Sequence, residues 1–362
     1  MVFFTPYPSY SLLVSSRIRV NRDSAARGRS AGVGVGGLSL GGGIPFVGTR
    51  YGWTSDTIVN YEIVVANGSV IKANGEENSD LAWALRGGSN NFGVVTRVDL
   101  QTFEQTPGYF YHPISTWEKA AENFVEITKA DIYDEYAHMT LSWGYTAGVG
   151  TAVAHGLDYT KPGEENPSIF SEILSLPLLF GASGISNMTQ KSLEVRAQQS
   201  ANGLRYNWST ITLVSTEAML NATYTRFKES LDEIQGLEDI VWSFTHEPLP
   251  PALYGRHAGS NPFGLGARNQ TLVVELLVAS WSQETDDQVV DSATRRLMSA
   301  IETDAQSLNA WDPFVYMNYA GPEQDPISSF GKQNVDRLRA IANRVDPDQV
   351  FLHQVPGGFQ LK

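Results

Sequence analysis

The sequence predicts an α+β fold, in which strands form antiparallel sheets and long helices cover them. Two observations support this class. Apolar residues recur at helical spacing in three long stretches, and β-branched or alternating runs typical of strands lie between them. Strands grouped with long helices favour an α+β domain. The expected helices are residues 116–129, 216–234 and 284–302, and the expected strands are residues 138–145, 151–157, 240–246 and 272–281.

The region before this domain is short, rich in strands and tightly turned. Residues 58–66 and 69–73 flank Asn67-Gly68, a dipeptide typical of a hairpin turn. A short helix over residues 81–86 is expected to start at Asp80 and to stop at Gly87-Gly88. The remaining expected elements are a strand at 93–103, a strand-like run at 314–319, a helix at 334–345 and a terminal loop at Gly357-Gly358.

Composition excludes several function classes. The net charge of −13 over 362 residues argues against nucleic acid and anionic membranes as partners, because both bind basic surfaces. The chain has no cysteine, which excludes disulfides and thiolate chemistry, and its six histidines show no metal-binding spacing. No run of about 18 apolar residues predicts a membrane span. We therefore expect no metal, no nucleic acid and no membrane partner.

Residues 32–43 read GVGVGGLSLGGG, and seven of these twelve residues are glycine. Such density indicates a backbone that must approach something closely, and a phosphate or pyrophosphate ringed by amide N–H groups is the first candidate. Residues 32–37 fit G-x-G-x-x-G, but they follow a polar stretch and run into a segment too rich in glycine and proline for a helix. The alternative is a flexible loop without a ligand.

The flanking residues carry a resemblance to a known family. The GVGGxxxGGG run, the hairpin RYGWTSDTIVNYEIVVANG, the segment DLAWALRGGSNNFGVVT and the C-terminal YMNYAGPEQDPISSFGKQNVDRLRAIANRVDPDQVFLHQVPGG occur in that order. Together they resemble the FAD-linked oxidases of the berberine bridge enzyme-like group, whose flavin domain is of the vanillyl-alcohol oxidase, or PCMH, type. The resemblance is strong over residues 28–103 and 314–358 and loose between them.

The resemblance implies a division into four segments. Residues 1–27 match nothing in the family, residues 28–105 would be the second FAD-binding subdomain, residues 106–310 an inserted substrate domain of antiparallel sheet covered by helices, and residues 311–362 a return to the FAD-binding domain. The flavin subdomain that precedes the glycine run in the family is not matched. An incomplete sequence is the favoured explanation, with a degenerate relative and a weak half-site as alternatives.

The resemblance also implies which residues contact FAD. Backbone N–H groups of the glycine run would face the pyrophosphate, and further positions would line the cofactor, although core packing is the favoured reading of Tyr51, Ile58 and Val95 when each is taken alone. Ser30 takes the place of the cysteine that tethers FAD in many relatives, so no covalent link is assigned. The residues implied at the cofactor are Gly34, Gly36, Gly37, Tyr51, Gly52, Asp56, Ile58, Gly93, Val94, Val95 and Asn318.

Tyr319 falls on the family's catalytic base position. A tyrosine there would take the substrate hydroxyl proton while hydride leaves for the flavin, and its pKa, ordinarily about 10, would have to drop. Val33 falls on the position that gates oxygen, and a small side chain there implies O2 as the electron acceptor. The alternative is that Tyr319 is an ordinary aromatic residue of a strand, with no catalytic role.

The expected function is therefore that of an FAD-dependent oxidoreductase acting on an alcohol, sugar or secondary metabolite. The alternative is a non-catalytic relative that serves as a binding module. Glu275, in an apolar strand, either has a raised pKa or points to solvent, and we favour solvent. Five N-x-S/T sequons, at Asn67, Asn187, Asn207, Asn221 and Asn269, hint weakly at secretion, whereas the N-terminal residues lack the pattern of a signal peptide.

Overall fold

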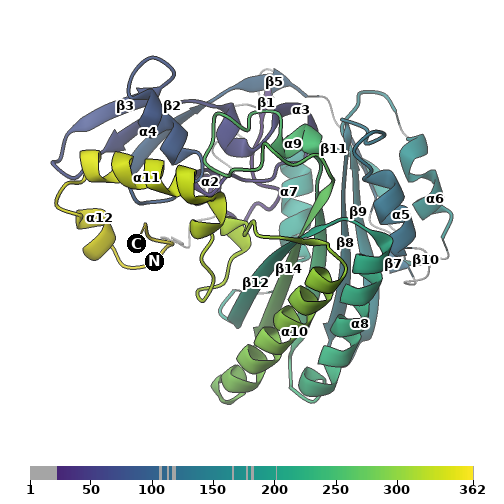
Figure 1. The fold of residues 1–362 in the computed structure, drawn as a ribbon. Coiled ribbons are helices and arrows are strands. Elements are labelled where there is room, and N and C mark those ends of the chain that lie inside the picture. Colours follow the sequence, from purple (N-terminus) through teal and green to yellow (C-terminus); the bar gives the residue numbers. More distant parts are fainter. Residues whose placement is uncertain are drawn as a thin grey trace.

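The structure is a computed structural model that describes residues 23–105, 108–111, 114–115, 120–164, 167–176, 178–180, 183–200 and 202–361. It contains mixed helices and antiparallel sheets, as predicted (Figure 1). The helices are α2 (Val35–Leu40), α3 (Gly48–Tyr51), α4 (Ser79–Leu85), α5 (Ala120–Ile127), α6 (Ser171–Leu174), α7 (Met188–Ala197), α8 (Glu217–Ile234), α9 (Pro251–Tyr254), α10 (Asp287–Ser307), α11 (Lys332–Val345) and α12 (Val350–His353).

Three sheets organise the strands. A three-stranded sheet has the order β3-β2-β4, a two-stranded ribbon pairs β1 with β5, and a ten-stranded sheet has the order β10-β7-β9-β8-β13-β14-β12-β15, with β6 paired to β9 and β11 paired to β6. The strands are β1 (Asp23–Ala25), β2 (Ile58–Val64), β3 (Val70–Asn74), β4 (Val94–Leu100), β5 (Thr102–Glu104), β6 (Gly108–Tyr111), β7 (Ile114–Ser115), β8 (Ala137–Thr146), β9 (Gly150–Tyr159), β10 (Leu178–Phe180), β11 (Ser183–Ser186), β12 (Arg205–Val214), β13 (Val241–Leu249), β14 (Leu272–Trp281) and β15 (Trp311–Asp312).

The buried apolar residues that the structure describes form two hydrophobic cores. One core fills the space between the large sheet and the helices α5, α8 and α10, and it includes Trp143, Phe227 and Leu297. The other core packs the small sheet, α4 and α11 together, around Trp53 and Tyr61. The second core is shared by early and late parts of the chain, so folding brings residues near the glycine run beside the C-terminal segment. The four domain boundaries given above stay predictions.

Most of the predicted elements are confirmed, and the reason is strong periodicity. The hairpin pairs β2 with β3 around Asn67-Gly68, and Gly68 has the positive φ of 82° that this turn requires. The long helices and central strands appear within a few residues of their predicted bounds. Residues 116–119 of one expected helix lie outside the described residues, and so do residues 1–22. The short helix α4 begins at Ser79 with Asn78 as its N-cap, so Asp80 lies inside its first turn.

Two predictions of local structure are wrong. The glycine run contains helix α2, because Val35 and Ser39 are buried and tertiary packing outweighs the weak helix propensity of glycine. The run at residues 314–319 is not a strand: it ends in a 3₁₀ turn at Met317–Tyr319. Its apolar residues Phe314 and Tyr316 are buried in the second core, which explains their strand-like pattern without a sheet partner.

Candidate functional site

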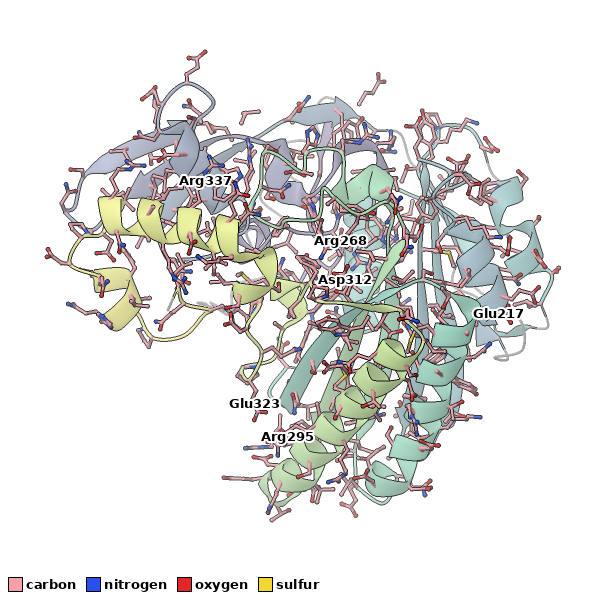
Figure 2. The ribbon with its side chains drawn as sticks, in the orientation of Figure 1. Glu217, Arg268, Arg295, Asp312, Glu323 and Arg337 are labelled. Carbon is pink, nitrogen blue, oxygen red and sulfur yellow. The ribbon has the colours of Figure 1, made fainter. Side chains whose placement is uncertain are left out.

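Tyr319 is held by a C-terminal segment that is anchored to the large sheet. Strand β15 pairs with β12, and Arg268 binds Asp312 through two hydrogen bonds of 2.5 and 2.9 Å (Figure 2). From this anchor the segment runs into the 3₁₀ turn that carries Tyr319. The anchor therefore fixes the place at which the phenol meets the sheet.

The phenol oxygen of Tyr319 lies between a cation and an anion. Arg29 donates a hydrogen bond of 2.5 Å to it from Nη2, and the same nitrogen forms an ion pair of 2.5 Å with Glu247 Oε2. The phenol itself donates to Glu247 Oε2 at 3.4 Å. Only 17% of the Arg29 side chain and 1% of the Glu247 side chain are exposed. Two groups that can hold or move a proton, a phenol and a carboxylate, thus meet a permanently charged guanidinium at one partly buried position.

Glu247 faces this site because of the two-residue period of strand β13. Its neighbour His246 points into the helix-covered core, where it pairs with Glu275, so Glu247 points to the opposite face. On that face Glu247 Oε1 accepts a hydrogen bond of 2.9 Å from His138 Nε2 on β8. His138 Nδ1 lies 3.2 Å from Asp158 Oδ2 on β9, and Lys191 Nζ on α7 lies 2.8 Å from Asp158 Oδ1.

Burial and neighbouring charges shift the pKa of several of these groups. Burial of its hydroxyl raises the pKa of Tyr319, against the opposing effect of Arg29 and with a further increase from Glu247. Burial alone would lower the pKa of His138, but its hydrogen bonds to Asp158 and Glu247 raise it overall. Burial would raise the pKa of Asp158, yet Lys191 and His138 lower it to about 2. These shifts favour a neutral phenol at Tyr319, a protonated ring at His138 and an ionised carboxylate at Asp158.

The glycine run divides into two parts with different surroundings. A side chain at Gly41 would put its Cβ 2.1 Å from Asn318 Oδ1, and Gly42 and Gly43 have φ values of 103° and 85°, so packing and backbone shape require these three glycines. By contrast, a Cβ at Gly34 or at Gly36 would meet nothing within 4 Å. The run is thus open rather than packed at Gly34 and Gly36.

The open part forms the start of helix α2. Gly34, Gly36 and Gly37 are exposed, and no side chain caps the helix at Gly34. The first N–H groups of any helix lack intrahelical partners. Asn318 links this helix to the Tyr319 turn, because its Nδ2 donates to Leu38 O at 3.0 Å and to the Tyr316 hydroxyl at 3.0 Å. The predicted cofactor residues of the run and Tyr319 are therefore neighbours in space.

A second group of predicted cofactor residues is engaged in structural contacts. Tyr51 stacks on Phe103 with ring centroids 4.2 Å apart. Asp56 accepts hydrogen bonds from the backbone N–H of Trp53 and from Asn261, and a Cβ at Gly52 would lie 2.7 Å from its carboxylate. Ile58 is only 1% exposed and packs in the second core. The roles of Tyr51, Gly52, Asp56 and Ile58 at the cofactor stay predictions.

The remaining predicted positions lie around strand β4 and at the start of the glycine run. Gly93 is buried where a Cβ would contact Val64 O at 2.5 Å. Val94 is 58% exposed, whereas Val95 is half-buried against the second core. Val33 is half-buried. Ser30 is 6% exposed and donates to Gln199 Oε1 at 3.0 Å, so this position ties the chain to the end of α7.

Sequence reasoning missed most of the groups around Tyr319. Arg29, His138, Asp158, Lys191 and Glu247 come from five separate segments, and no spacing in the sequence connects them. Among the described residues no cluster of three or more histidine or acidic side chains could hold a metal ion.

The expectation that Glu275 faces solvent is wrong. Glu275 is fully buried between the large sheet and its covering helices, and its Oε1 lies 2.8 Å from His246 Nδ1. The central strand β14 is buried on both faces, so alternation could not reveal the direction of this side chain. Burial raises the pKa of Glu275, against the opposing effect of His246.

Comparison with known proteins decides the family. A family model described as "Berberine and berberine like" matches residues 315–355. The FAD-dependent monooxygenase tpcD of Cochliobolus heterostrophus is 32% identical over 366 residues, which cover 96% of this chain and 70% of that protein. This chain belongs to the berberine bridge enzyme-like family of FAD-dependent oxidoreductases. The C-terminal match includes the Tyr319 turn, which the berberine bridge enzyme-like fold thus places beside the glycine run.

Other similar proteins are longer than this berberine bridge enzyme-like chain. Oligopeptidase PhomG' of Diaporthe leptostromiformis is 39% identical over 353 residues, and the match spans 96% of this chain but only 29% of that protein. The crystal structure of 6-hydroxy-D-nicotine oxidase from Arthrobacter nicotinovorans superposes with a TM-score of 0.75 at 19% identity. It covers 94% of this chain and 75% of that one, which shows the shared fold.

Proposed function

We propose that this protein is an FAD-dependent oxidoreductase that removes a hydride from a carbon bearing a hydroxyl group, in an alcohol, a sugar or a secondary metabolite. The observation that carries the proposal is the partly buried contact of Tyr319 with Arg29 and Glu247. FAD, when bound, supplies the hydride acceptor. The chain's own residues bind the cofactor and take the hydroxyl proton.

The start of helix α2 fits the cofactor's pyrophosphate. Gly34, Gly36 and Gly37 are exposed, and open space flanks Gly34 and Gly36 where side chains would otherwise stand. Uncapped N–H groups at a helix start donate to anionic oxygens. We therefore assign the pyrophosphate to these three residues, with Gly93, Val94 and Val95 toward the rest of the cofactor. Asn318 positions the helix rather than touching the pyrophosphate, because its amide is engaged with Leu38.

Tyr319 accepts the substrate proton with help from its two neighbours. A neutral phenol cannot accept a proton and keep its own, so its hydrogen passes to Glu247 Oε2, 3.4 Å away, as the substrate hydroxyl proton reaches the phenol oxygen. Arg29 donates to that oxygen and stabilises the negative charge that develops on it. This transfer agrees with the raised pKa of Tyr319, because no long-lived tyrosinate is needed.

We propose O2 as the electron acceptor and Val33 as the residue that admits it. Val33 lies one residue before Gly34, and its small side chain leaves room beside the assigned cofactor position. Replacing it by phenylalanine would slow reoxidation of the reduced flavin by O2 without slowing its reduction. Equal reoxidation rates in the Val33→Phe variant and the parent would remove the gate assignment.

The experiment is anaerobic reduction of the FAD-reconstituted protein. Bleaching of the oxidised-flavin absorbance would be followed with a panel of reducing oligosaccharides such as xylobiose, secondary alcohols and phenolic alcohols. Reduction by at least one of them, with loss in Tyr319→Phe, would support the proposal. The binding-module alternative would be favoured if the intact protein bound FAD tightly, and dithionite reduced the bound flavin, but no member of a broad substrate panel did so.

A further inference from the structure

The polar contacts of Glu247 continue away from Tyr319 as a chain of alternating charges. Lys191, Asp158, His138, Glu247 and Arg29 contact one another in that order, with N–O distances of 2.8, 3.2, 2.9 and 2.5 Å. The side chains are buried: exposure is 1% for Lys191, 3% for Asp158, 8% for His138 and 1% for Glu247. Isolated buried charges are costly, so these side chains stabilise one another through their contacts.

His138 connects the two carboxylates in this series of charged side chains. Both of its ring nitrogens face carboxylate oxygens, Nδ1 toward Asp158 and Nε2 toward Glu247, so both donate only when the ring carries two protons. The ring of Phe46 packs edge-on against it at 5.4 Å, which fixes its plane. An imidazolium in this position donates to both carboxylates, so a change at Asp158 alters the hydrogen bond that Glu247 accepts.

Helix α7 supports both ends of this series of charged side chains. It carries Lys191, and it also holds the segment that leads to Arg29, because Arg27 donates to Thr189 at 3.3 Å and the Ala31 N–H donates to Ser192 O at 2.9 Å. The helix starts with its own cap, in which Asn187 accepts from the Gln190 N–H at 2.9 Å. One element of ten residues thus fixes the cation at each end.

We propose that Lys191 and Asp158 are positioning residues for Tyr319, and that they act through His138 to hold Glu247 oriented toward the phenol. The inference rests on the proposed function for its consequence, but not for its geometry. Without Lys191, Asp158 keeps its contact with His138, which draws the imidazolium toward Asp158 and away from Glu247. Loss of the Asp158 charge has the opposite effect on the ring.

The test is the protonation of His138, measured by NMR titration of protein labelled at its histidine rings. Groups that face His138 from the surrounding elements are Asp158, Glu247 and Arg29, with Lys191, Tyr133 and Tyr319 behind them. In the parent, His138 should stay protonated above its ordinary pKa of about 6.5. Lys191→Met should raise the pKa of His138 by about one pH unit or more, and Asp158→Asn should lower it by a similar amount.

Controls separate charge from loss of folding. Lys332→Met removes a lysine that is 88% exposed and pairs with Asp336 on the same helix, and it should leave His138 unchanged. If a single variant does not fold, Lys191→Met with Asp158→Asn removes the pair together and should fold. In this double variant the pKa of His138 should fall below that of the parent. An ordinary pKa of His138 in the parent, or shifts of the same sign in the two single variants, would overturn the proposal.

A second readout connects the chain to the reaction. In the FAD-loaded protein, Lys191→Met should change the pH dependence of the flavin reduction rate, while KM changes little, because no substrate contact is assigned to Lys191. If no substrate reduces the flavin, the proposed function fails, yet the titration of His138 still decides the positioning claim. An unchanged pH profile in active Lys191→Met protein would overturn the inference and leave the proposed function standing.

Discussion

Arg29 and Tyr319 lie 290 positions apart in the chain, and the guanidinium donates a 2.5 Å hydrogen bond to the phenol oxygen. This contact joins the approach to the glycine run with the C-terminal turn that matches the berberine-like family. The same guanidinium neutralises Glu247, so a phenol, a carboxylate and a cation share one buried site. A hydride-transferring enzyme needs such a site, because the hydroxyl proton of the substrate must leave as the hydride does.

The two parts of the glycine run predict different mutant effects. Gly41→Ala places a Cβ against Asn318 and should lower the free energy of unfolding by about 1–3 kcal/mol through overpacking. Gly36→Ala enters open space inside a helix and should leave stability unchanged or raise it by up to about 1 kcal/mol. FAD affinity, measured by quenching of flavin fluorescence, should nevertheless fall in Gly36→Ala. Unchanged affinity in that variant would contradict the assignment of the pyrophosphate.

His155 predicts a loss of stability in mild acid. Burial lowers its pKa to about 4, from an ordinary value of about 6.5. Between about pH 6.5 and pH 4 the His155 ring is protonated in the unfolded chain but neutral in the folded chain. The free energy of unfolding is therefore unaffected by His155 above about pH 6.5, and it declines as the pH falls toward 4. The total contribution is about 3 kcal/mol.

Urea unfolding between these pH values would measure the effect. The slope of unfolding free energy against pH should become shallower in His155→Leu and should not change in His353→Gln, which alters an exposed histidine. Parallel slopes for the parent and His155→Leu would show that His155 titrates normally in the folded state.

The buried pair of His246 and Glu275 predicts non-additive mutations. Each side chain is fully buried, and the Trp143 ring lies 4.1 Å from the His246 ring. Glu275→Leu alone should cost about 3–5 kcal/mol, because it leaves a polar ring in an apolar core. His246→Leu with Glu275→Leu should cost less than the sum of the single changes. Additive unfolding free energies in this cycle would mean that the two groups do not interact.

Glu247 predicts a joint effect on stability and chemistry. Glu247→Gln removes the negative charge between Arg29 and His138 and should lower the free energy of unfolding by about 3 kcal/mol. Flavin reduction by substrate should slow at the same time. Glu323→Gln is the matched control, because Glu323 pairs with Arg295 at the surface and should cost less than about 1 kcal/mol (Figure 2). Equal effects of the two changes would refute the buried role of Glu247.

The fold was predictable where one sequence segment sufficed to specify an element. The hairpin around Asn67-Gly68 and the helix at Glu217–Ile234 follow from turn chemistry and amphipathic spacing, which act within a few residues. Helix α2 was not predictable in this way, because the burial of Val35 and Ser39 that stabilises it comes from distant parts of the chain.

The site was predictable only where a family motif covers it. Tyr319 and the glycine run stand in recognisable segments, whereas Glu247 and His138 lie in strands whose residues look like ordinary sheet positions. Their meeting depends on the order of strands β9, β8 and β13 in the sheet, which fixes three side chains on one face. The order of the strands in the sheet cannot be predicted from the local sequence.

The central claim is that Tyr319 takes the substrate proton. The most direct measurement compares anaerobic, substrate-driven bleaching of bound flavin in the parent and in Tyr319→Phe, each first shown to bind FAD and to be reduced by dithionite. We predict rapid bleaching in the parent and a rate lower by about 100-fold or more in Tyr319→Phe, as for loss of a general base. Equal rates of bleaching in the two proteins would contradict the account.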